Sequence, residues 1–194
     1  LESVDGKERI LGYIYTTAAA PLAAANLTSV SELGTGAFAY NQKLASITFG
    51  DKLTAVPGYA FTGATALSAI TLPETITELG AQAFYSAQMT SVDLSHIDVI
   101  GAQAFANTPL TSVVLKEGAK IGTGAFMNCD SLTDVANLDK AVEIGAYAFR
   151  GAAFEKVNLA AAESVGDYAF ALSAVKEVSF GEKLATLGEN PFYG

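Results

Sequence analysis

Few side chains in this sequence could carry out acid–base or nucleophilic chemistry. There is one histidine, His96, and two acidic residues, Asp93 and Asp98, lie on either side of it. A catalytic triad needs a nucleophile beside a base that an acid orients, and no nucleophile elbow lies near His96 in the sequence. We therefore interpret His96 as an exposed histidine in a turn, and we expect no catalytic residues.

The one cysteine, Cys129, is a candidate for metal or thiol chemistry. A zinc site needs three or four Cys, His or carboxylate ligands, but Cys129 and His96 lie 33 residues apart at different positions of the repeat described below. The acidic residues show no calcium-binding spacing. Other repeats have Ala, Thr, Asn or Ser where Cys129 stands, so we interpret it as a small core residue rather than a reactive thiol. We expect no metal and no cofactor.

Three acidic residues, Asp93, Asp134 and Glu177, fall on outward positions of predicted strands and could supply the carboxylate pair of a glycosidase. They belong to repeats at least two apart, and at ~4.8 Å per coil such carboxylates lie ~10 Å apart. That separation is at or beyond the range for an inverting glycosidase, and the predicted face is flat. The two Gly-Thr-Gly segments, residues 34–36 and 122–124, lack the lysine of a phosphate-binding loop. The chain is therefore predicted not to be an enzyme.

The strongest pattern in the sequence is an Ala-Phe pair that recurs every 21 to 23 residues. A period of this length is typical of repeat architectures, in which one unit cannot bury its own apolar face. The regularity predicts a solenoid in which each phenylalanine stacks on that of the next coil. The repeated phenylalanines are Phe38, Phe61, Phe84, Phe105, Phe126, Phe149 and Phe170, with Pro191-Phe192 as a variant.

The surroundings of each Ala-Phe pair repeat as well. An aliphatic residue stands five positions before the phenylalanine, and glycine follows it in every repeat but one, where Pro57 stands. This glycine allows either a positive φ or a close approach of neighbouring coils. A Leu-x-x-Val-x-Leu phrase comes after the phenylalanine, and its alternation predicts a short strand. The Gly-x-x-Ala-Phe segment is too short for a full helix and predicts one helical or 3₁₀ turn.

Together these patterns predict an α/β repeat fold. We expect a right-handed leucine-rich-repeat solenoid of about seven or eight coils. Short parallel strands should form one face and short helical or 3₁₀ turns the other.

The repeat resembles the BspA-like leucine-rich repeats of surface proteins from anaerobic bacteria and some protists. Residues 100–105 (Ile-Gly-Ala-Gln-Ala-Phe) and 70–73 (Ile-Thr-Leu-Pro) match that pattern closely. The resemblance extends over about residues 27–194. It implies a cell-surface or secreted protein that contacts host or neighbouring-cell proteins, including extracellular matrix. Departures from the pattern are Pro57, an extra residue near Ala136 and Asn137, and Pro191 in place of alanine.

The two ends of the chain differ from the middle. Residues 1–26 fit the repeat poorly, although Tyr15 stands 23 residues before Phe38 and Ile10 stands five before Tyr15. We interpret residues 1–26 as a degenerate N-terminal coil or cap, because solenoids cover their last apolar layer with atypical units. A linker from an upstream domain is the alternative. Residues 27–194 form the predicted solenoid.

At the C-terminus, the sequence stops two residues after Phe192 with no strand phrase and no polar capping coil. We expect either a longer array or a short natural end. An apolar layer left open there predicts a weak homodimer through the uncapped C-terminal end.

Alternation along the predicted strands defines an outward face that could bind a partner, and the parallel strand ladder should make this face continuous. Early repeats place short hydroxyl side chains on this face and later ones charged residues, so it is either a partner-binding surface or simply a well-formed polar β-surface. The tyrosines near each phenylalanine lie on the opposite flank, where we expect them to pack over the coil edges. The candidate partner-binding residues are Ser46, Thr48, Thr71, Ser91, Asp93, Ser112, Asp134, Lys156, Asn158 and Glu177.

The overall charge narrows the class of partner. The chain carries 11 basic and 20 acidic residues, a net charge of −9, so nucleic acid and anionic membrane surfaces are unfavourable partners. No stretch approaches the ~18 apolar residues of a transmembrane helix, and no signal sequence is present in this chain. We expect a non-enzymatic interaction module that binds an extracellular or surface protein. A structural spacer or stalk in a larger surface protein is the alternative, and carbohydrate binding is less favoured because the predicted strand face lacks aromatic residues.

Overall fold

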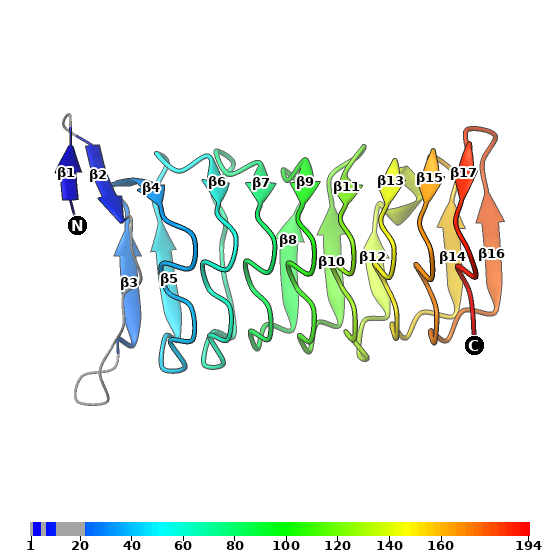
Figure 1. Ribbon diagram of the computed structural model, residues 1–194, viewed down its shortest axis with the longest axis horizontal. Coiled ribbons are helices and arrows are strands. Elements are labelled where there is room, and N and C mark those ends of the chain that lie inside the picture. Colours follow the sequence, from blue (N-terminus) through cyan, green and yellow to red (C-terminus); the bar gives the residue numbers. More distant parts are fainter. Residues whose placement is uncertain (1, 5–6, 11–21) are drawn as a thin grey trace.

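The protein is a β-solenoid whose coils stack side by side along one axis (Figure 1). The computed structural model describes residues 2–4, 7–10 and 22–194. Each regular coil contains a longer strand, a two-residue strand, and the turn that carries the repeated phenylalanine. Strands β1 and β17 lie at opposite ends of the solenoid (Figure 1). No helix among the described residues is long and apolar enough to span a membrane.

The longer strands form the face that the Leu-x-x-Val-x-Leu phrases predict. They pair in parallel, but in three separate groups: β3 with β5, β8 with β10 and β12, and β14 with β16. These strands are β3 (Ala24–Leu27), β5 (Ser46–Phe49), β8 (Ser91–Leu94), β10 (Ser112–Leu115), β12 (Asp134–Ala136), β14 (Lys156–Leu159) and β16 (Glu177–Phe180). The parallel strands are confirmed, whereas the expectation of one unbroken ladder is wrong at two places.

The first break is at residues 67–72, which contain the predicted face residue Thr71 but form no strand. Pro73 follows this phrase directly and has no amide hydrogen to donate to the neighbouring coil. The second break lies between β12 and β14, which do not pair.

A second sheet, which the sequence does not predict, runs along the upper edge of the molecule in Figure 1. It consists of seven parallel two-residue strands without a break. These are β6 (Ala55–Val56), β7 (Glu78–Leu79), β9 (Val99–Ile100), β11 (Lys120–Ile121), β13 (Glu143–Ile144), β15 (Ser164–Val165) and β17 (Thr186–Leu187). Each contains the aliphatic residue that precedes phenylalanine by five positions. Two residues are too few to show an alternation, so the pattern is visible only as a single apolar position.

The turn around each phenylalanine is not a helix, so the α/β description is not confirmed. In the coil of Phe105, Gln103 and Asn107 have φ values of 55° and 58°, a left-handed conformation that breaks a right-handed helix. The amides of Gln103, Phe105 and Asn107 donate to carbonyls of the next coil, whereas those of Ala104 and Ala106 donate three residues back. The chain therefore alternates between bonds within its coil and bonds to the next. The one helix among the described residues is a 3₁₀ turn, η1 (Leu138–Lys140).

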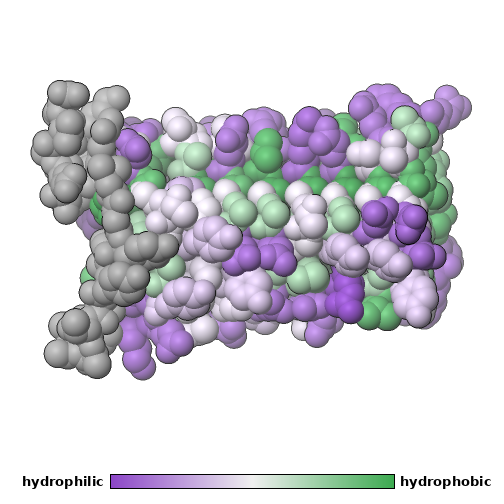
Figure 2. All heavy atoms as spheres, in the orientation of Figure 1, coloured by the Kyte–Doolittle hydropathy of each residue, from purple (hydrophilic) through white to green (hydrophobic). Residues whose placement is uncertain are grey.

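The phenylalanine column forms the centre of the core, as predicted. Successive rings from Phe38 to Phe192 stack with centroids 5.3–5.6 Å apart and planes within 4–13° of one another. Rings at this separation gain stacking energy beyond area burial. Equivalent side chains of successive coils line up in rows along the axis, and Figure 2 shows a row of white and green residues between rows in which purple predominates.

The glycine after the aliphatic residue is required by close approach between coils. A Cβ on Gly101 would lie 2.5 Å from the carbonyl oxygen of Leu79 and from the carbonyl carbon of Gly80 in the preceding coil. The φ of Gly101 lies outside the left-handed region. Of the two roles considered for this glycine, close packing of coils is therefore the one observed.

The N-terminal strands differ from the regular coils. Strand β1 (Glu2–Val4) is antiparallel to β2 (Lys7–Ile10), and β2 pairs in parallel with β4 (Val30–Leu33). Ile10 is buried, and Tyr15 lies outside the described residues. The first longer strand, β3, begins at Ala24, so the boundary placed between residues 26 and 27 lies inside it. The role of residues 1–26 as a cap stays a prediction.

The C-terminal coil exposes apolar side chains that other coils bury. Val178, Phe180 and Leu187 are 40%, 41% and 49% exposed, whereas Val157 and Leu159, one coil earlier, are buried. Green residues gather at this end of the molecule in Figure 2.

Candidate interaction surface

The outward positions of the longer strands form the predicted polar face. In β8, Ser91 and Asp93 are exposed while Val92 and Leu94 are buried, and β14 repeats this alternation. Ser112 is half-buried, and the other predicted positions are exposed. Those exposed positions are Ser46, Thr48, Thr71, Ser91, Asp93, Asp134, Lys156, Asn158 and Glu177.

The two breaks divide this face into three parts. Parallel pairing places Ser91, Ser112 and Asp134 in one row across β8, β10 and β12. A second row joins Lys156 to Glu177 across β14 and β16. The structure therefore brings together the predicted residues within each group, but it does not align all ten in one ladder.

Several of these polar groups are already engaged within the protein. Lys156 Nζ lies 2.9 Å from Glu177 Oε2, an exposed ion pair that contributes little to stability. The Ser95 amide donates to Asp93 Oδ1 at 2.9 Å, and this bond, with a further one from the Ser95 side chain, holds the pKa of Asp93 below its usual value of 3.8. Asp93 thus stabilises the turn after β8.

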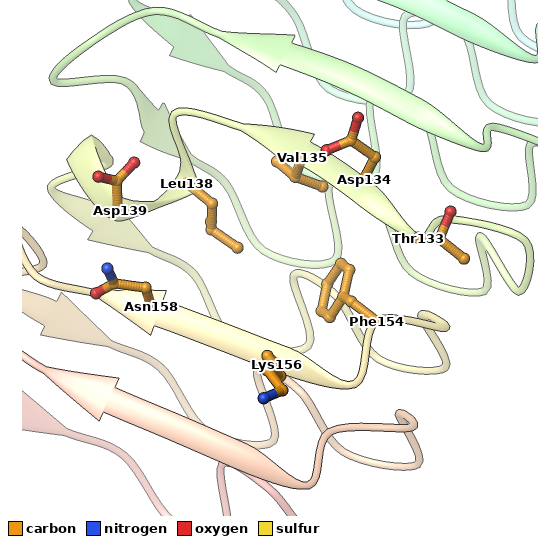
Figure 3. A pocket seen from close by; sticks show the side chains of 8 residues that line it. All are labelled: Thr133, Asp134, Val135, Leu138, Asp139, Phe154, Lys156 and Asn158. Carbon is orange, nitrogen blue, oxygen red and sulfur yellow. The ribbon is translucent and has the colours of Figure 1, made fainter.

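The break between β12 and β14 opens a pocket of about 270 Å³ on this face (Figure 3). Its floor is apolar and its rim is polar. Three of its lining residues, Asp134, Lys156 and Asn158, are among those predicted for the binding face, but the pocket itself was not. The lining residues are Thr133, Asp134, Val135, Leu138, Asp139, Phe154, Lys156 and Asn158.

The extra residue near Ala136 and Asn137 accounts for the break. Asn137 adopts a left-handed conformation with φ of 64°, and its Nδ2 donates to Leu115 O of the preceding coil at 2.9 Å. The chain then enters η1 instead of continuing β12 to the length of its neighbours. The sequence shows the insertion, but its consequence for the next coil depends on backbone pairing that the pattern does not encode.

Of the residues considered for chemistry, only Asp134 lines this pocket, and His96 and Cys129 do not. His96 is half-buried rather than exposed, and its Nε2 is buried without a hydrogen-bond partner among the described residues, so the prediction of an exposed histidine is wrong. The turn between β8 and β9 folds back against the coil, and Ile97 beside it is fully buried. Within the described part of the chain, no three His, Cys, Asp or Glu side chains are placed to hold a metal ion.

Cys129 is a fully buried core residue, as predicted. Its Sγ lies 3.2 Å from Phe105 O and 3.2 Å from Thr108 Oγ1. Burial raises the pKa of the thiol, which disfavours the reactive thiolate.

The tyrosines of the opposite flank behave in two ways. Tyr147 and Tyr168 stack with centroids 5.4 Å apart and planes within 6°, so these two pack over the coil edges as expected. Tyr40, in contrast, is 74% exposed.

Comparison with known proteins places the repeat in a described family. A family model described as BspA type Leucine rich repeat region matches residues 22–119 and 98–194, in six copies. No curated protein matches the sequence significantly.

Three solved structures illustrate the similarity. The T. pallidum leucine rich repeat protein is 30% identical with a TM-score of 0.62, over 66% of this chain and 63% of that one. A leucine-rich repeat protein from Eubacterium ventriosum is 16% identical with a TM-score of 0.65, over 89% and 51%. The pneumococcal vaccine antigen PcpA is 20% identical with a TM-score of 0.54, over 87% and 54%. The match spans only about half to two thirds of the length of these three proteins.

Proposed function

This chain belongs to the family of BspA type leucine rich repeat regions, and we propose that it is a non-enzymatic module that binds another protein. The observation that carries the proposal is the outward face of the longer strands, where exposed polar side chains recur at a fixed register. Repeat proteins commonly bind through such extended faces.

A cell-surface or secreted location is part of the same proposal. One protein of similar fold is described as a vaccine antigen, which supports exposure outside the cell. The partner would then be an extracellular or surface protein of a host, the matrix or a neighbouring cell, bound in adhesion. The exposed Val178, Phe180 and Leu187 additionally support a weak homodimer through that end, which sedimentation at increasing concentration would detect.

Capture of purified matrix and serum proteins on the immobilised chain tests the proposal. The triple variant Asp134→Lys, Lys156→Glu, Glu177→Lys reverses the charges of the face and should reduce capture at least tenfold, because like charges across an interface are strongly unfavourable.

The matched control exchanges Lys120 and Glu143, an ion pair of the second sheet at 2.5 Å, and should leave capture unchanged. Equal capture by all three proteins would refute the assignment of the binding face. Equal loss in both variants would also refute it, because reversing charges away from the face would then have the same effect.

A further inference from the structure

The gap between β12 and β14 differs from a simple surface depression because both strand edges that face it lack a strand partner. Within the described part of the chain, β12 pairs only with β10, and β14 only with β16. Among the described residues, the two coils are joined on this face by Ala153 N to Leu132 O at one end and Ala161 N to Asp139 O at the other, both at 2.9 Å. Backbone donors and acceptors between those bonds are left for water or a ligand.

The floor of the gap is suited to an aliphatic chain. Val135 and Leu138 belong to β12 and η1, and Phe154 precedes β14. Figure 3 shows Leu138 and Phe154 pointing into the space between the two strands. The volume of about 270 Å³ is below the ~300–1,000 Å³ of pockets for drug-sized ligands, so it suits a single side chain better than a whole small molecule.

The rim carries a negative excess. Asp134 and Asp139 line the gap, and neither forms an ion pair with another described residue. The one cation in the lining, Lys156, is held at 2.9 Å by Glu177, and Figure 3 shows its ammonium directed away from the gap. A cationic group would therefore find unpaired carboxylates, whereas an anion would compete with Glu177 for Lys156.

We propose that this gap receives the side chain of a lysine or arginine from the protein partner. The inference rests on the proposed function, because it names the chemistry of the partner on the same face. The aliphatic part of the guest lies over Leu138 and Phe154, as long basic side chains do on apolar surfaces. Its charged head meets Asp139, which faces Asn158 across one end of the gap in Figure 3, while Asp134 adds attraction from β12.

Lys156 determines whether the gap prefers a cationic or an anionic side chain. With its charge offset by Glu177, it tolerates a cation beside it. Removing Lys156 should strengthen binding of a cation and weaken binding of an anion, so this residue separates the two alternatives in a single experiment.

The test uses NMR titration of the whole chain with three blocked pentapeptides, Gly-Ser-Arg-Ser-Gly and its versions with Met or Glu in place of Arg. The arginine peptide should cause saturable shifts at the Val135 and Leu138 methyl groups, with affinity in the millimolar range. Asp139→Asn should weaken this binding about fivefold, as expected for a partly exposed ion pair. Lys156→Gln should strengthen it, and Asp51→Asn, an exposed acid in the turn after β5, should leave it unchanged.

Three results would overturn the inference: no saturable shift, equal binding of the methionine or glutamate peptide, or equal weakening by Asp51→Asn and Asp139→Asn. A response to a free monosaccharide at the same methyl groups without one to the arginine peptide would also reject it, in favour of a sugar. If the peptide fails while the charge-reversed face still loses capture of a partner, the inference fails and the proposed function stands. If the peptide binds as described but the face variants capture normally, the gap is a basic-side-chain site and the proposed binding face is wrong.

Discussion

Replacing Phe105 with alanine tests whether the stacked column holds the solenoid together. Phe105 is fully buried between Phe84 and Phe126, with ring centroids at 5.4 and 5.6 Å. Burying a phenylalanine side chain contributes ~1.5–3 kcal/mol, and each of its two stacked contacts adds ~0.5–1.5 kcal/mol. The free energy of unfolding should therefore fall by ~3–5 kcal/mol, the range seen for Phe→Ala in closed cores.

Urea unfolding followed by circular dichroism measures this loss from the midpoint and slope of the transition. Phe180→Ala is the matched control, because Phe180 is 41% exposed and forms a T-shaped ring contact with Phe192, at 6.1 Å between centroids. The control should lose only ~1 kcal/mol. A loss below ~1 kcal/mol for Phe105→Ala, or equal losses in the two variants, would refute the packed column. A lower slope for Phe105→Ala would show that the solenoid unfolds in two parts, as nearest-neighbour coupling allows.

Further measurements address three other features: the close approach at Gly101, the burial of Cys129 and the pKa of Asp93. Gly101→Ala should lower the unfolding free energy by ~1–3 kcal/mol through collision with the preceding coil. At Gly118, φ is 80° and a Cβ would meet nothing within 4 Å. Gly118→Ala should therefore lower the unfolding free energy by only ~1 kcal/mol, through backbone strain. A larger loss for Gly118→Ala than for Gly101→Ala would contradict the close approach of coils at Gly101. Cys129 should resist a thiol reagent at pH 8 until urea unfolds the chain, and rapid native labelling would show that it is not buried. NMR titration of Asp93 should give a pKa below 3.8. Because the pKa of this carboxyl is lower in the folded than in the unfolded chain, the carboxyl stabilises the fold above pH ~4. That stability is lost as the pH falls through the folded pKa. Asp93→Asn should remove that contribution, and an unshifted Asp93 would mean that the Ser95 bonds do not persist.

The sequence predicts best those features in which one side chain occupies the same place in every coil. The phenylalanine column, the buried position of Cys129 and the alternation in β8 and β14 all follow from period and residue type. In a stacked column the same residue type is required in every coil, so the pattern repeats along the sequence. It can therefore be recognised without any knowledge of the backbone.

Features that depend on backbone bonding between coils could not be predicted in this way. The strands of the continuous second sheet have two residues each, and each strand contributes one inward side chain. A turn with one apolar residue would give the same sequence pattern. The left-handed residues on either side of Phe105 are Gln103 and Asn107, and neither residue type demands that conformation by itself. These positions become strand and turn only because the neighbouring coil supplies the partner for their amides.

The gap between β12 and β14 follows neither from a repeated side chain nor from regular bonding between coils, because it arises where the repeat is interrupted. The extra residue near Asn137 removes the ladder between β12 and β14, and unpaired backbone groups there would cost ~1–3 kcal/mol each if they were buried. They are tolerated because they lie at the surface and because the second sheet keeps β13 and β15 paired across the same two coils. One side of the solenoid thus maintains the stack while the other becomes free to vary. In a regular ladder each row presents nearly the same surroundings as the next, so a partner could slide by one coil at small cost. An irregular coil removes that degeneracy, and for this reason we expect the gap to fix the register in which a partner binds the face.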